Sequence, residues 1–134
     1  MRGRTVVLAL VLAGLALAVT PALGGRGNSS ISLVMLSGST GATGSGPQIG
    51  NQVTFEITTT ATDQPWVNVN CYQDGAWAYG QWHGFFPGYQ FGQTFSLGPT
   101  TLWQAGAAEC TATLAMWQNG RDKALASTSF HVNG

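Results

Sequence analysis

The chain has 134 residues, of which five are Lys or Arg and five are Asp or Glu. Its length suits one domain. Only 7% of the residues are charged and 44% are hydrophobic, whereas about 25% of an ordinary soluble domain is charged. So few charges exclude a highly charged disordered chain. They also exclude a nucleic-acid binder, whose affinity depends on clustered Lys and Arg.

The first residues have the layout of a secretory signal peptide. Arg2 and Arg4 form a positive start, residues 5–19 are apolar or small, and Pro21 ends that run before a small-residue cleavage region. We predict that residues 1–24 are a signal peptide and that the protein is secreted. After secretion it could also stay associated with the cell surface. An uncleaved membrane anchor is the alternative, although the run is shorter than the roughly 20 residues that span a bilayer.

Cleavage would leave a mature chain with three basic and five acidic side chains, a net charge of −2. Such a small charge predicts no strong steering of charged polymers and no nucleic-acid partner. No second hydrophobic segment of spanning length occurs, so we expect no stable membrane span after cleavage. Residues 25–30 are expected to form a flexible mature N-terminus and residues 31–134 the folded domain. In an oxidising compartment the two cysteines, Cys71 and Cys110, are expected to form one disulfide.

Beyond the signal segment, apolar residues recur with a period of two, and turn residues interrupt them about every ten positions. This pattern indicates short β-strands. The expected strands are 31–36, 53–58, 66–72, 77–82, 94–97, 108–117 and 124–132. Asp74-Gly75 and Asn119-Gly120 predict two-residue hairpin turns. Strands of this number and length are typical of an all-β sandwich.

The alternation also predicts which side chains face the core. The inward set is Val53, Phe55, Ile57, Val67, Val69, Cys71, Phe95, Leu97, Ala108, Cys110, Ala112, Leu114, Met116, Thr128, Phe130 and Val132. In the strand 77–82, alternation places Trp77 and Tyr79 on one face and Trp82 on the other.

Three short segments resemble bacterial immunoglobulin-like domains. Residues 50–55 (GNQVTF) are similar to the turn and second strand of that family, 110–114 (CTATL) to its sixth strand, and 130–132 (FHV) to its last. The resemblance covers about residues 30–134. It implies an immunoglobulin-like sandwich of about seven antiparallel strands in Greek-key order, used for adhesion, spacing or ligand presentation. It implies no catalytic residues.

The cysteines depart from the antibody-type arrangement, in which a disulfide joins the second and sixth strands across the two sheets. Here the second expected strand, 53–58, has no cysteine, while Cys71 falls on the third and Cys110 on the sixth. These two strands are neighbours within one sheet in the family's order, so the resemblance implies a bridge between adjacent strands. A rival numbering takes 66–72 as the second strand and Trp82 as the core tryptophan.

Residues suited to catalysis or metal binding are sparse. The chain has two histidines, His83 and His131, and neither is accompanied by the three or four ligands that a metal site needs. No Gly-x-Ser-x-Gly nucleophile motif occurs. The two strand carboxylates, Glu56 and Glu109, are expected on different sheets. We therefore expect no enzyme activity, no metal and no cofactor.

Aromatic residues are concentrated between Tyr72 and Phe91. The eight in this segment are Tyr72, Trp77, Tyr79, Trp82, Phe85, Phe86, Tyr89 and Phe91. One interpretation is that the last four cover an open end of the core. The other is a ligand surface, because exposed aromatic rings stack on sugars or contact proteins. The candidate ligand-binding residues are Trp77, Tyr79, Trp82, Phe85, Phe86 and Tyr89.

The sequence thus favours a secreted, non-catalytic immunoglobulin-like binding module whose partner is an extracellular protein or glycan. Two alternatives stay open. One is a structural subunit of an extracellular fibre or surface layer, since low charge and many Gly and Thr residues suit dense packing. The other is a carbohydrate-binding module that uses the exposed aromatics.

Overall fold

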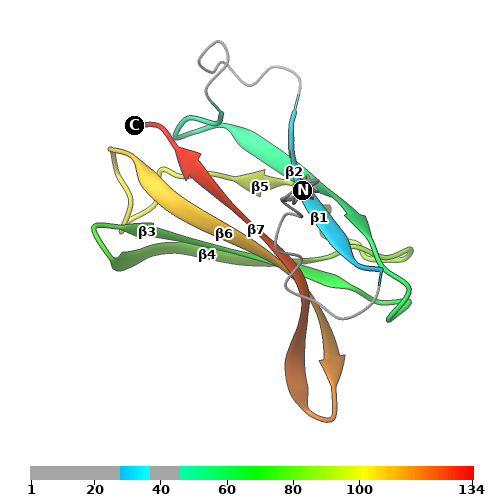
Figure 1. Ribbon diagram of the computed structural model, residues 1–134. Helices are drawn as coiled ribbons and strands as arrows, with labels where there is room; N and C mark the ends of the chain where they lie inside the picture. The colour runs from blue at the N-terminus through cyan, green and yellow to red at the C-terminus, as the bar shows by residue number, and fades with distance from the viewer. Residues whose placement is uncertain (1–27, 37–45) are drawn as a thin grey trace, which may run out of the picture.

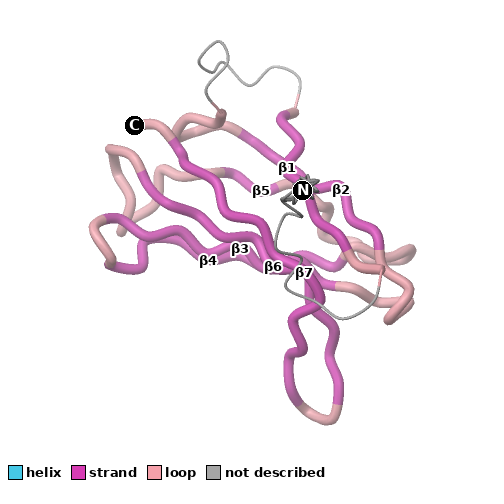
Figure 2. The backbone as a smooth tube through the Cα atoms, viewed as in Figure 1, coloured by secondary structure: helices cyan, strands magenta, loops and turns pink. Residues whose placement is uncertain are grey.

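The computed structural model describes residues 28–36 and 46–134, and within these ranges every regular element is a β-strand. The strands form two antiparallel sheets that lie face to face (Figures 1 and 2). The sequence therefore predicted an all-β sandwich correctly. The predicted signal peptide 1–24, the first part of the predicted N-terminal segment 25–30, and residues 37–45 lie outside the described residues.

Seven strands make up the two sheets. They are β1 (Ser30–Met35), β2 (Gln52–Thr58), β3 (Trp66–Gln73), β4 (Ala76–Gly84), β5 (Phe95–Ser96), β6 (Ala108–Gln118) and β7 (Arg121–Val132). One sheet has the order β1-β2-β5 and the other β4-β3-β6-β7. The chain therefore passes between the sheets after β2, after β4 and after β5.

The core lies between the sheets and contains the predicted inward side chains. Val53, Val67, Val69 and Leu114 are completely buried, and partly buried Ile57, Met116 and Phe130 pack against the same cluster. Alternate residues of each strand point to one face, so a period-two pattern gives each sheet one apolar face. Burial of these two apolar faces against each other is the main stabilising contribution to the sandwich.

Both predicted hairpin turns are present. Asp74 and Gly75 have φ angles of 49° and 80°, and Asn119 and Gly120 have φ angles of 53° and 73°. Positive φ at both central residues is the requirement of the turn that matches strand twist. The second turn closes the β6–β7 hairpin, whose tip projects beyond the body of the sandwich (Figure 1).

The disulfide joins Cys71 of β3 to Cys110 of β6. These residues are direct partners in the register of two neighbouring strands of one sheet, which confirms the expected bridge between adjacent strands. The rival numbering is wrong, because the strand that begins at Trp66 is the third in the chain and Trp82 is 42% exposed.

A β-bulge in β4 changes the predicted orientation of its aromatic side chains. Cys71 pairs with Tyr79 and Tyr72 pairs with Trp77, so Ala78 is an extra residue. The bulge places Trp77 on the outer side, half exposed, while Tyr79 points into the core. The prediction that Trp77 and Tyr79 share a face was therefore wrong, because simple alternation does not hold across a bulge.

The largest fully buried side chain, Trp103, comes from the loop between β5 and β6. Its indole Nε1–H donates to the carbonyl oxygen of Gly106 over 2.9 Å, and its ring lies edge-on to Tyr79 with centroids 6.3 Å apart. β5 has only two residues instead of the predicted 94–97. Phe95 and Leu97 are nevertheless both buried, as expected.

A short parallel contact ties the segment before β2 to the end of β7. Gln48 and Asn133 form an isolated parallel bridge. The amide of Ile49 donates to the Asn133 carbonyl and the amide of Asn133 donates to the Pro47 carbonyl, each over 2.8 Å. This contact joins the two sheets along one side of the sandwich.

Candidate functional site

The side of the four-stranded sheet that faces away from the core, called the outer face below, carries the largest group of exposed aromatic rings. Register between the four strands sets its side chains in rows across the sheet. Its members are Trp77, Gly80 and Trp82 of β4; Trp66, Asn68, Asn70 and Tyr72 of β3; Glu109, Thr111, Thr113 and Trp117 of β6; and Asp122, Ser127, Ser129 and His131 of β7.

The middle of the outer face is polar and uncharged. One row across the sheet contains Asn70, Thr111 and Ser129, and the next contains Asn68, Thr113 and Ser127. Their amide and hydroxyl groups can each accept or donate hydrogen bonds. Charged groups lie beyond the two ends of this stretch: Glu109 and His131 form a hydrogen-bonded pair at one end, and Asp122 lies at the other.

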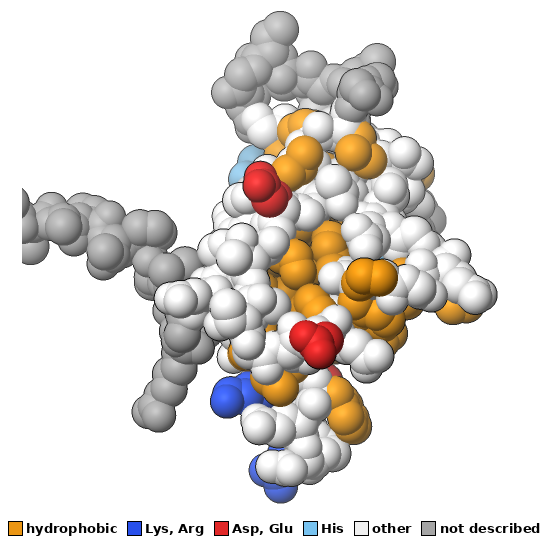
Figure 3. Space-filling view, turned by 90° about the vertical axis from the view of Figure 1, so that its right-hand side faces the viewer, with side chains coloured by type: hydrophobic (Ala, Val, Ile, Leu, Met, Phe, Trp, Pro, Cys, Tyr) orange, Lys and Arg blue, Asp and Glu red, His pale blue; other side chains and the backbone are white. Residues whose placement is uncertain are grey.

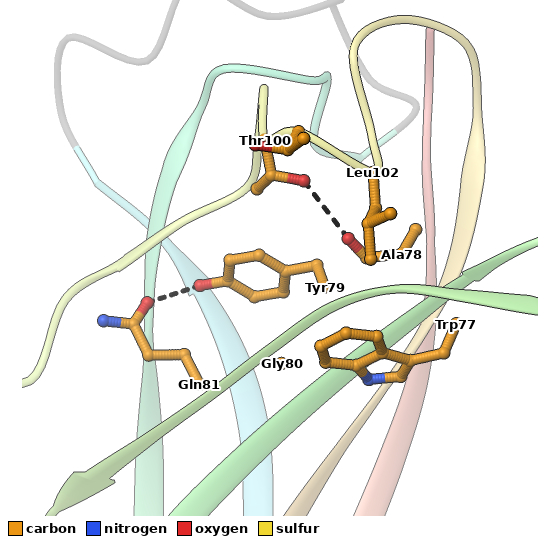
Figure 4. Close-up of a pocket in the computed structure, with 8 residues that line it drawn as sticks. Trp77, Ala78, Tyr79, Gly80, Gln81, Thr100 and Leu102 are labelled. Carbon is orange, nitrogen blue, oxygen red and sulfur yellow. Dashed lines mark hydrogen bonds between the residues drawn. The ribbon is translucent and has the colours of Figure 1, made fainter.

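Trp77 lies flat at one end of the outer face. A Cβ atom at position 80 would come within 2.8 Å of the Trp77 ring, so the indole covers Gly80. Its Nε1–H donates to Oδ1 of Asn70 over 3.0 Å, and 51% of the residue remains exposed. Figure 4 shows Trp77 and Tyr79 on opposite sides of β4. Trp77 is thus an exposed ring held in one orientation.

An open hollow lies at the other end of the outer face, lined by Trp66, Trp82, Trp117 and Asp122; we call it the tryptophan hollow. Its volume of about 480 Å³ falls within the range of small-molecule sites, roughly 300–1,000 Å³. Trp82 and Trp117 are 42% and 65% exposed. Trp117 and Asp122 are register partners in the β6–β7 hairpin, and they line the hollow together with Trp66 of β3 and Trp82 of β4.

Aromatic packing fixes Trp66 in the wall of the hollow. Phe86 and Tyr89 contact its ring edge-on, with centroids 5.6 and 5.5 Å away. This packing depends on Gly84, because a Cβ atom there would approach the Phe86 ring to 2.5 Å. The segment after β4 therefore supports the tryptophan hollow from the side.

Asn68 carries a buried acceptor on the outer face. Its register partners are Trp82 on β4 and Thr113 on β6. The Oδ1 atom is buried, and no donor in ranges 28–36 and 46–134 reaches it. A buried polar atom without a partner costs about 1–3 kcal/mol relative to a satisfied one. Because Oδ1 has almost no exposed surface, a donor from a ligand reaches it only after the side chain turns outward.

The aromatic residues between 72 and 91 divide into five groups. Phe85 packs against the core, stacked on Phe95 at 6.3 Å, and is the one residue that fits the core-covering interpretation. Phe86 and Tyr89 support Trp66, and Phe91 is 80% exposed. Tyr72, Trp77 and Trp82 lie exposed on the outer face. Tyr79 is buried.

Tyr79 differs from the other candidate ligand-binding residues in its burial. Its hydroxyl donates to Oε1 of Gln81 over 2.5 Å, and burial raises the pKa of its phenol to about 12. Ligand contact by Trp77, Tyr79, Trp82, Phe85, Phe86 and Tyr89 stays a prediction. Sequence reasoning missed Trp66 and Trp117. The signal was available, because each alternates with inward-facing residues of its own strand and so falls on the outward side.

A second hollow lies along the edge of β4, between Trp77–Gln81 and Thr100–Leu102 (Figure 4). Thr100 Oγ1 donates to the Ala78 carbonyl over 3.2 Å, so the loop caps part of this sheet edge. Leu102 is 61% exposed above it. The residues that line this hollow include one indole ring, that of Trp77, and the exposed aliphatic side chain of Leu102, whereas the tryptophan hollow brings together three indole rings and a carboxylate.

His83 is a buried imidazole at the end of β4. Its ring lies 4.7 Å from that of Phe95, and Nδ1 lies 3.3 Å from the Tyr89 hydroxyl. Burial lowers the pKa of His83, and the backbone of Thr94 opposes this in part. The folded protein therefore favours the neutral imidazole.

We expect the free energy of unfolding to decrease as the pH falls below about 6.5, the ordinary pKa of histidine. The unfolded chain binds a proton there while folded His83 still resists it, so the slope approaches at most about 1.4 kcal/mol per pH unit. Urea unfolding between pH 7.5 and 5 measures this slope. His83→Gln should flatten it, and a slope in this variant equal to that of the wild type would contradict the expectation.

The described part of the chain holds no group of three or more His, Cys, Asp or Glu side chains placed to bind a metal ion. Both cysteines are in the disulfide. Over the same residues, no helix is long and apolar enough to cross a membrane.

Comparison with known proteins finds no match for this chain among protein-family models, curated proteins or solved structures. The chemistry of the site itself therefore has to carry any functional inference.

Proposed function

We propose that this protein is a secreted, non-catalytic binding module of the immunoglobulin-like type, and that its binding surface is the outer face of the four-stranded sheet. The tryptophan hollow carries the proposal. Three indole rings converge there from β3, β4 and the β6–β7 hairpin around an open space with a carboxylate beside it. Exposed Trp side chains dominate the energetics of binding surfaces, and they contribute little to the fold where they are exposed.

The strand order supports the immunoglobulin-like assignment. The first, second and fifth strands share one sheet and the third, sixth and seventh share the other. This is how the A, B and E strands and the C, F and G strands divide in that fold. β4 would be the additional strand beside C. The disulfide departs from the antibody pattern by linking β3 to β6.

Three features support secretion. Residues 1–24 have the layout of a signal peptide. A disulfide persists in oxidising compartments and is rare in the cytosol. Low charge on the folded domain also suits a surface that contacts neutral extracellular material. The only basic side chains in the described ranges, Arg121 and Lys123, lie near the tip of the β6–β7 hairpin.

The sheet edges give less support to the alternative of a fibre subunit. Exposed edge strands pair readily with other chains unless they are covered. The edge of β4 is partly capped where Thr100 bonds to Ala78, and the end of β7 is paired with the segment around Gln48. We therefore place recognition on the outer face instead of on the edges.

The proposal is tested with the double variant Trp82→Ala/Trp117→Ala. Because both rings are exposed, each change is expected to cost less than about 1 kcal/mol of stability. Binding to an array that carries both immobilised glycans and extracellular proteins should be lost with the variant and retained with the wild type. Met35→Ala removes a similarly exposed apolar side chain from the other sheet and is the control.

Two results would count against this function. One is a wild-type protein that binds nothing on either part of the array. The other is a double variant that binds as the wild type does, which would remove the tryptophan hollow from recognition. Unfolding curves for all three proteins show whether a loss of binding reflects a loss of fold.

A further inference from the structure

We infer that the outer face binds a neutral polysaccharide, with the sugar chain running along the strands from the tryptophan hollow to Trp77. This inference rests on the proposed function and names the class of its ligand. It depends on four features of the outer face: the rings at both ends, the polar stretch between them, the buried acceptor of Asn68 and the distribution of charge.

The rings and the polar groups together fit a sugar chain. One side of a pyranose ring is a flat array of C–H bonds, which packs on the face of an indole, while its hydroxyl groups project from the rim and donate or accept hydrogen bonds. Trp82 stands beside Asn68 and Thr113 in one row of the sheet. An apolar ring beside an amide and a hydroxyl therefore matches both parts of one sugar unit.

Asn68 points to a ligand that donates hydrogen bonds. Its Oδ1 is buried on the outer face and no donor of the described chain reaches it. Most buried polar side-chain atoms in proteins do have a partner. An apolar ligand offers this acceptor no donor, whereas a sugar hydroxyl can donate to it once the Asn68 side chain turns outward on binding.

The charge distribution favours a neutral chain over an acidic one. Asp122 is the charged residue in the wall of the tryptophan hollow, and it would repel a uronate or sulfated sugar. Arg121 and Lys123 flank Asp122 on β7, and alternation along the strand points their side chains to the side opposite that of Asp122. Figure 3 shows Lys and Arg side chains only at the hairpin tip, away from the hydrophobic side chains that gather at the centre of that view.

The spacing of the two aromatic ends favours an oligosaccharide over a single sugar. Asn68, beside the hollow, and Tyr72, beside Trp77, are separated by four residues of β3, or about 13 Å at roughly 3.3 Å per residue. Asn70 and Thr111 lie between them. A chain of several sugar units is needed to contact the rings at both ends.

Affinity electrophoresis tests the inference with the folded, disulfide-bonded protein. The gels contain a soluble neutral β-glucan, xylan, mannan or α-glucan, or the acidic polymer polygalacturonate. At least one neutral polysaccharide should retard the wild type, and polygalacturonate should not. Trp82→Ala should weaken that binding at least tenfold, and Met35→Ala, at an exposed side chain of the other sheet, should leave it unchanged.

Two further variants separate ligand contact from effects on folding. Asn68→Ala removes an acceptor without a partner, so stability should stay the same or rise, while affinity falls between about twofold and tenfold through the lost hydrogen bond. Trp77→Ala should reduce the preference for a hexasaccharide over the corresponding disaccharide, which in the wild type should be at least tenfold. Titration calorimetry measures both.

Retardation by polygalacturonate alone, retardation that Trp82→Ala does not change, or no retardation by any of the neutral polymers would overturn the inference. The mixed array described above separates this failure from failure of the proposed function. Binding of an immobilised protein that depends on Trp82 and Trp117 would keep the binding module and exclude the sugar ligand. No binding of either class would exclude both.

Discussion

The variant Cys110→Ser is expected to lower the melting temperature by ten degrees or more. The disulfide closes a segment with a sequence separation of 39 residues, for which the chain-entropy model gives roughly 4 kcal/mol. In a domain of this size each kcal/mol corresponds to about 4–8 °C. The substitution also leaves a serine hydroxyl at a position that is 1% exposed, which adds a desolvation cost.

Thermal unfolding followed by circular dichroism measures the effect. The control is the double variant Cys71→Ala/Cys110→Ala, which removes the cross-link but places no hydroxyl in the core. It should be destabilised, but less than Cys110→Ser. A melting temperature that stays within two or three degrees of the wild type in both variants would contradict a stabilising role for the bridge. So would two free thiols per molecule in a titration of the denatured, unreduced protein.

The parts of the fold that depend on local pattern could be predicted from the sequence. Val67, Val69 and Cys71 face the core because they alternate with polar residues, and that pattern needs no knowledge of the rest of the chain. Asp74-Gly75 marks a turn because few other residue pairs adopt two consecutive positive φ angles. Where the physical cause lies within a few residues, it can be read along the chain.

The parts of the fold that depend on contacts between distant segments could not be predicted from the sequence. Trp103 lies in a loop with no periodicity, so its burial follows from the space that the two sheets leave between them. The bulge at Ala78 is a property of the pairing between β3 and β4. The tryptophan hollow brings together Trp66, Trp82 and Trp117, and only strand register places those three rings side by side. The clustering of aromatic residues along the sequence pointed to the segment 72–91, which contains only one of these three rings, that of Trp82.

Trp103→Ala is expected to destabilise the protein by about 3–5 kcal/mol, the range for truncating a large buried aromatic. Its side chain is completely buried, and it contacts Tyr79 of β4 while its indole bonds to Gly106 of its own loop. The loop therefore covers one end of the core through this residue. Since most small domains have a total stability of about 5–15 kcal/mol, this variant should be close to the limit of folding.

Trp103→Phe keeps an aromatic ring in the core but loses part of the side-chain volume and the hydrogen bond to Gly106. Its free energy of unfolding should therefore lie between those of Trp103→Ala and the wild type. Urea unfolding of the three proteins, with Trp82→Ala beside them, compares a buried and an exposed tryptophan in one domain. We expect a loss below about 1 kcal/mol for Trp82→Ala. If Trp82→Ala cost as much as Trp103→Ala, the rings of the outer face would be part of what holds the sandwich together, and their exposure would no longer argue for a ligand.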